Sequence, residues 1–191
     1  MCELLLLSPE EVRAGGHARE PRPPAILHTL EATPRLLETI LAPAASAHFD
    51  WKPSATRWSI SEVLAHLVVV EEKVLGLRVR RIETEDLPLL ESYDQNEQAA
   101  LGVYSGFDGR ERLAAFARAR SETLAWLRRI PAARWTREAR HPEVGVVRMS
   151  QFLHLWAFHD LGHLRQITEL FRAQAFWDGI GSLQRYYSVN P

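Results

Sequence analysis

The stretch Met149–Arg172 constrains the fold of this chain more than any other, because it reads as one uninterrupted amphipathic helix. Ser150 is the predicted N-cap, and no proline follows before Pro191. At about 100° per residue, several side chains recur on a single face. They are Phe152, Trp156, His159, His163, Gln166 and Leu170. The two histidines therefore lie one turn apart in the middle of an apolar face.

His159 and His163 place two titratable rings at positions where a protein core favours leucine. Burying adjacent imidazoles costs free energy unless their nitrogens find partners. A divalent metal ion is one solution, because neutral imidazole binds zinc, nickel, iron and copper. The other solution is a pair of core histidines hydrogen-bonded to carbonyls or carboxylates. His159 and His163 alone do not decide between the two, and a third ligand is needed before the metal interpretation has weight.

Two amphipathic helices are predicted in the first half of the chain. The first spans Pro24–Leu41, and Pro34 is expected to kink it or restart it near Thr33. The second begins at a capping box, Ser59-Ile60-Ser61-Glu62, which is a specific signal for a helix start. Its apolar positions form a broad face, made of Ile60, Val63, Leu64, Leu67, Val70, Val74 and Leu75.

A third helix is predicted over Asp108–Arg129, after the long irregular connection Glu83–Phe107. The last helix follows a second irregular piece, in which Val144–Val147 is expected to form one short strand. Four long helices with separate apolar faces predict an all-α protein, a four-helix bundle. A connection as long as Glu83–Phe107 lets the second and third helices run in the same direction, which gives an up-down-down-up order.

Composition restricts the remaining classes of protein. The 191 residues fit one domain, predicted over residues 24–191 with an aromatic C-terminal tail, after an N-terminal arm at residues 1–23. The net charge of −1 offers no basic field for nucleic acid or for a membrane surface. With Cys2 as the one cysteine, an intrachain disulfide and a thiolate metal cluster are excluded. The leucine run Leu4–Leu7 is too short for a membrane span, and a cytoplasmic location is expected.

His66 is the third histidine expected on a buried face. It falls in line with Val63 and Val70 of the second helix. Facing helices of a bundle can bring His66, His159 and His163 around one ion. Three neutral nitrogens and one open position are typical of a catalytic rather than a structural metal site. The open position would hold water or a thiolate, and no other catalytic group is identified.

Other residues of the last helix are expected beside this site. Gln166 and Asp160 are candidate hydrogen-bond partners of the ligands, although Asp160 can equally face solvent. Trp156, one turn before His159, is expected to pack in the core and to line the pocket. His154 lies on the opposite side of the helix and is expected to be exposed.

The segments WSISEVLAHL, from Trp58, and HDLGHLRQI, from His159, resemble the DinB-like superfamily of four-helix proteins, which includes thiol-dependent S-transferases. The resemblance covers about Pro24–Phe171. It implies an up-down-down-up bundle that is often a homodimer, with nickel or zinc bound by His66, His159 and His163. Despite the family's name it implies no DNA binding, which agrees with the near-zero net charge.

The resemblance also implies a class of reaction. Characterised relatives transfer low-molecular-weight thiols, such as bacillithiol or mycothiol, to small electrophiles. A metal ion would hold the sulfur as thiolate and raise the fraction of reactive nucleophile. One alternative is a metal-dependent hydrolase, which lacks an obvious general base because no H-E-x-x-H motif is present. The other is a catalytically silent helical module for dimerisation or binding, with packed core histidines.

Overall fold

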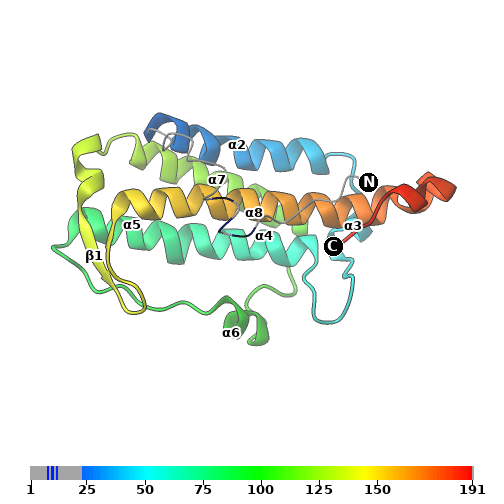
Figure 1. The fold of residues 1–191 in the computed structure, drawn as a ribbon, viewed down its shortest axis with the longest axis horizontal. Coiled ribbons are helices and arrows are strands. Elements are labelled where there is room, and N and C mark those ends of the chain that lie inside the picture. Colours follow the sequence, from blue (N-terminus) through cyan, green and yellow to red (C-terminus); the bar gives the residue numbers. More distant parts are fainter. Residues whose placement is uncertain (1–7, 9, 11, 13–22, 191) are drawn as a thin grey trace.

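Four long helical segments run side by side in the molecule (Figure 1). The computed structural model describes residues 8, 10, 12 and 23–190, so the arm predicted at residues 1–23 lies almost wholly outside the described residues. The helices are α2 Pro23–Leu41, α3 Ser46–Asp50, α4 Ile60–Val69, α5 Leu75–Thr84, α6 Gln95–Ala100, α7 Gly109–Leu127 and α8 Met149–Phe176. The shorter elements are the π-helical turn η1 Val70–Val74, the 3-10 helices η2 Ala132–Thr136 and η3 Asp178–Tyr186, and the strands β1 Glu138–His141 and β2 Gly145–Arg148. The predicted all-α, four-helix bundle is confirmed.

Local capping explains where two of the long helices begin. The Ser59 side chain accepts a hydrogen bond from the Glu62 amide at 3.2 Å, and the Glu62 carboxylate accepts one from the Ser59 amide at 2.8 Å. Asp108 accepts a bond from the Glu111 amide at 2.9 Å. These bonds satisfy amides that have no partner inside the helix. The cap of helix α8 lies two residues earlier than predicted, at Arg148 rather than at Ser150.

The two predicted irregular connections contain regular structure. Asp94 caps the short helix α6 inside the first connection, through bonds from the Asn96 and Glu97 amides. In the second, the single strand expected near Val146 is half of an antiparallel hairpin, in which Glu138 pairs with Arg148. A two-stranded hairpin satisfies backbone groups that an isolated strand would leave unpaired.

The long segments follow an up-down-down-up order (Figure 1). Helix α2 packs against α7 and α8, and α4 packs against the same two helices. A Cβ atom added to Gly109, at the start of α7, would meet Phe49 and Ser61, so α7 and α4 begin at the same end of the bundle. At the other end, Arg128 pairs with Glu31 of α2 at 2.8 Å, so α7 runs antiparallel to α2. The predicted direction of the second and third long helices is confirmed.

Helix α2 passes through Pro34 without ending, so the restart predicted near Thr33 does not occur. A proline inside a helix has no amide hydrogen for the carbonyl four residues earlier, here that of Leu30. The guanidinium of Arg120 donates a hydrogen bond to this carbonyl at 2.7 Å. A buried side chain from α7 therefore satisfies the group that Pro34 leaves free.

The π-helical turn η1 joins α4 to α5 and carries Glu71 on its buried side. A Cβ atom added to Gly76 would overlap the Glu71 carbonyl oxygen, because the wider turn brings that carbonyl towards the start of α5. Glycine is therefore needed at position 76 for the turn to form. Such turns are frequent at functional sites.

A polar layer crosses the middle of the bundle and divides the apolar core into two clusters. One cluster contains Leu30, Val70, Leu124 and Trp156, and the other contains Leu37, Leu67, Phe116 and Ile167. Between them, on the same helices, lie buried or half-buried polar side chains. These are His66, Glu71, Arg120, His159, Asp160 and His163. Among the described residues, no helix is both long and apolar enough to cross a membrane.

Candidate metal centre

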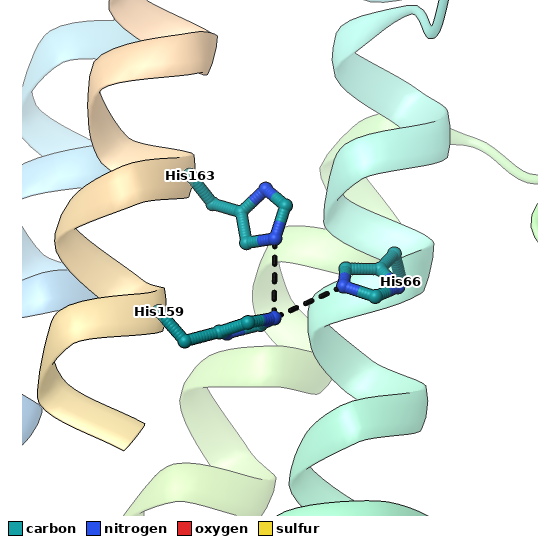
Figure 2. A group of neighbouring side chains, drawn as sticks. All are labelled: His66, His159 and His163. Atoms are coloured by element: carbon teal, nitrogen blue, oxygen red, sulfur yellow. Dashed lines mark hydrogen bonds between the residues drawn. The ribbon is translucent and has the colours of Figure 1, made fainter. Parts of the chain in front are cut away.

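Three imidazole rings from two helices converge in the polar layer (Figure 2). His66 comes from α4, whereas His159 and His163 come from successive turns of α8. Nε2 of His159 lies 3.1 Å from Nε2 of His66 and 3.1 Å from Nε2 of His163. One nitrogen from each ring lies within 4.8 Å of the other two. The structure thus brings together the three histidines that the sequence singled out.

The nitrogen of His159 has more neighbours than it can satisfy. An imidazole nitrogen takes part in one hydrogen bond, either as donor or as acceptor. Nε2 of His159 can therefore bond to His66 or to His163, but not to both. Two nitrogens that bind one ion at about 2.0–2.1 Å are roughly 2.9–3.4 Å apart, depending on the angle at the ion. The two separations of 3.1 Å at His159 fall in this range, and they fit a shared cation better than they fit two hydrogen bonds to one nitrogen.

Gln166 fixes the orientation of one ring, since its Oε1 atom lies 2.9 Å from Nδ1 of His163. Amide oxygen accepts only, so the proton of this ring is on Nδ1 and the lone pair is on Nε2, the atom that faces the other two histidines. Histidine ligands usually donate their second ring N–H in this way. Nδ1 of His66 and of His159 have no hydrogen-bond partner among the described residues.

Burial keeps the three rings uncharged. Burial, together with smaller repulsion from the rings of His163 and His159, lowers the pKa of His66 to about 2. Burial also lowers the pKa of His159 to about 3, with added repulsion from His163 and Arg120. The pKa of His163 is lowered by burial too, against opposing effects of Gln166 and Asp160. At neutral pH the rings are in the form that binds a metal ion.

An aromatic wall, made of Trp58 and Tyr104, covers the His66 ring. Each of these rings has its centroid 5.1 Å from that of His66. Tyr104 is buried, and its hydroxyl bonds to that of Tyr93, which lies earlier in the same connection. The sequence analysis gave no role to either tyrosine, because the irregular connection has no period that predicts a buried face.

Arg120 lies at the centre of a buried ionic network beside the histidines. Its Nη1 and Nη2 atoms donate to Asp160 at 2.5 and 3.1 Å, and its Nε and Nη2 atoms donate to Glu71 Oε2 at 3.0 and 2.8 Å. All three side chains are at most 1% exposed. With its bond to the Leu30 carbonyl, Arg120 joins all four long helical segments.

This network gives Asp160 a place that the sequence did not predict. The carboxylate neither faces solvent nor bonds to a histidine ring, and its described hydrogen bonds go to Arg120. Sequence reasoning also missed Arg120 and Glu71. A signal for Arg120 was present, because it occupies a position of the buried stripe of α7, which is Leu113, Phe116, Arg120, Leu124 and Leu127. A charge on an apolar stripe is as informative as a histidine there.

Trp156 and His154 of α8 are the two remaining residues for which the sequence predicted a position. Trp156 is 1% exposed and packs in the core, with the guanidinium of Arg120 5.6 Å from its ring centroid. His154 is half-buried rather than exposed, and its Nδ1 atom lies 2.7 Å from the Ser150 carbonyl oxygen. The expected exposure of His154 is therefore wrong, because its side chain folds back on the first turn of the helix.

Known proteins resemble this chain over most of its length. The model of the DinB superfamily matches residues 29–167. A protein of Oceanobacillus iheyensis, provisionally named metal-dependent hydrolase OB0782, is 24% identical over 144 residues, which is 75% of this chain and 83% of the relative. The structure of YfiT from Bacillus subtilis, described as a probable metal-dependent hydrolase with an unusual four-helix bundle topology, has a TM-score of 0.71 at 22% identity. That likeness covers 83% of this chain and 93% of YfiT, and it concerns the fold.

Proposed function

The chain belongs to the DinB superfamily, and on that premise we propose that His66, His159 and His163 hold one divalent metal ion in an enzyme that acts on small molecules. The observation that carries this proposal is the crowded Nε2 atom of His159, whose two neighbours at 3.1 Å cannot both be hydrogen-bonded. The neutral state of the rings and the bond from His163 to Gln166 support it. Zinc and nickel are among the ions that suit an all-imidazole set.

The ion would supply positive charge that stabilises an anionic nucleophile, either a thiolate or a deprotonated water. The protein's own groups favour the thiolate. The two carboxylates of the polar layer, Glu71 and Asp160, are both bound to Arg120 and buried, so neither is free to take a proton from water. A thiol loses its proton near pH 8.5 even without a metal ion, whereas water does so near neutral pH only when it is bound to the ion. We therefore infer transfer of a low-molecular-weight thiol to a small electrophile.

Hydrolysis is the second candidate, and a specific observation favours it. The relative from Oceanobacillus iheyensis is provisionally named a metal-dependent hydrolase, and YfiT is described as a probable one. A hydrolase would need a group that accepts a proton from water. The described residues place no carboxylate in the histidine cluster, so the substrate or the solvent would have to fill this role.

An activity panel with metal-loaded protein distinguishes the two reactions. The protein is incubated with zinc or nickel, a small thiol and a chromogenic electrophile, and separately with a set of esters. Thiol transfer predicts thioether formation that a chelator abolishes, with esters unchanged. His163→Ala should lose the activity, and His154→Ala, a histidine of the same helix outside the cluster, should keep it. Ester cleavage without thioether formation would establish the hydrolase instead, and metal-independent activity would contradict both.

A further inference from the structure

The three imidazoles are neutral and bring no negative charge to a divalent ion, whereas the neighbouring network of Glu71, Arg120 and Asp160 is charged. Glu71 and Asp160 carry two carboxylates, and Arg120 carries one guanidinium, so the ionised network has one net negative charge inside the bundle. The network and the rings affect each other: Asp160 raises the pKa of His163 against the larger effect of burial, whereas Arg120 lowers the pKa of His159 in the same direction as burial. Charges interact more strongly in the protein interior than in water, because the dielectric constant there is low.

Three departures from regular helix geometry build this network. The π-helical turn places Glu71 on the buried side, Gly76 makes room for that turn, and Pro34 frees the Leu30 carbonyl for Arg120. Buried ion pairs add little to stability compared with apolar side chains of the same size. Stability alone therefore gives no physical reason for a charged layer in the core of this bundle.

We propose that Glu71, through the Arg120–Asp160 pair, provides the counter-charge of the metal centre and so strengthens the binding of a divalent ion. This inference rests on the proposed function only in requiring that the three histidines bind metal. Glu71 is a positioning residue in this role, because its hydrogen bonds go to Arg120 and it is not part of the histidine cluster. Burial raises the pKa of Glu71 overall, although Arg120 opposes this effect, and a cation bound nearby would favour the ionised carboxylate.

The test compares Glu71→Gln with Glu72→Gln, which removes the same charge from the neighbouring, exposed position. The affinity for Zn²⁺ is measured by competition with a chromophoric chelator at fixed pH and salt. We expect roughly tenfold or greater weakening for Glu71→Gln and less than a twofold change for Glu72→Gln. Equal affinity of Glu71→Gln and the native protein would overturn the proposal, as would equal losses in the two variants.

A measurement with a second, monovalent ion distinguishes loss of the counter-charge from distortion of the site. The same competition with Cu⁺ should show a logarithmic loss about half that for Zn²⁺, because the interaction scales with ionic charge. Equal losses for both ions would point to displaced ligands and contradict the proposal. If Glu71→Gln does not fold without metal, Asp160→Asn replaces it in the test. This variant removes the same charge, and the same loss of Zn²⁺ affinity is expected. Absence of metal binding by the native protein would instead refute the proposed function.

Discussion

His66 and His159 are 93 positions apart in the sequence, yet their Nε2 atoms lie 3.1 Å from each other in the middle of the bundle. Helix α4 carries one ring and α8 the other, and these two helices pack against each other (Figure 2). His163, one turn further along α8, adds a third nitrogen on the same side. The topology of the bundle therefore brings the ring from α4 to the local pair of rings on α8.

The hydrogen bond between Gln166 and His163 should strengthen metal binding. Replacing Gln166 by Leu removes the acceptor that fixes the ring, and we expect zinc affinity to fall roughly 10–100-fold. Gln166→Glu keeps an acceptor at the same place and should bind at least as tightly as the native protein. Chelator competition measures both variants. An unchanged affinity of Gln166→Leu would show that the bond has no part in binding.

The stability of the metal-free protein should decrease as pH falls below about 6.5. The pKa values of His66 and His159 are about 2 and about 3 in the folded protein, below the ordinary value of 6.5 that applies to the unfolded chain. Between those limits the unfolded state binds protons and the folded state does not, which costs about 1.4 kcal/mol per pH unit for each ring.

Urea unfolding at pH 7 and pH 5 measures this loss, in a range above the titration of ordinary carboxylates. His66→Phe removes one of the three rings whose pKa is lowered and should flatten the pH dependence. Equal stability of the native protein at both values of pH would mean that the rings are protonated in the folded state.

Gly76 should tolerate no side chain. Gly76→Ala would press a methyl group against the Glu71 carbonyl oxygen, and we expect a loss of about 1–3 kcal/mol in the free energy of unfolding. Gly162 of α8 is the matched control, because an added Cβ there has nothing within 4 Å. Gly162→Ala should stabilise the protein by about 0.5–1 kcal/mol. Chemical denaturation compares the two, and a neutral Gly76→Ala would contradict the account of the π-helical turn.

Much of the fold could be predicted from the sequence, because helix starts and breakers are local signals. The Ser59 capping box predicted the start of α4, and the length of the connection before Asp108 predicted that α7 runs parallel to it. The hairpin could not be predicted in full, since its first strand depends on pairing of Ala139 with Val147 and has no clear alternation of its own. Pairing between segments is a property of the folded chain.

The candidate site, like the fold, could be predicted from the sequence only in part. The three histidines could be found because rings on an apolar stripe are conspicuous. Arg120 and Glu71 also occupy buried positions, but no spacing rule indicates that two charges from different helices will meet. The position of Glu71 further depends on the π-helical turn, and a period of 3.6 residues does not describe such a turn.

Arg120 should be costly to remove. Arg120→Met leaves Glu71 and Asp160 buried without their partner, and we expect a loss of roughly 3–5 kcal/mol. Arg128→Met breaks the exposed pair with Glu31 and should cost at most about 1 kcal/mol. Thermal and urea unfolding of both variants provide the comparison. Similar losses in the two variants would mean that the buried network contributes no more than a surface ion pair.

The account depends most on one divalent ion bound by His66, His159 and His163. Anomalous diffraction from crystals of protein purified without added metal, at the zinc and nickel absorption edges, tests this directly. We predict a single peak per chain between the three Nε2 atoms, and its loss in His159→Ala. A native crystal with no peak at that position, in which the three rings are instead hydrogen-bonded to water or protein, would contradict the account.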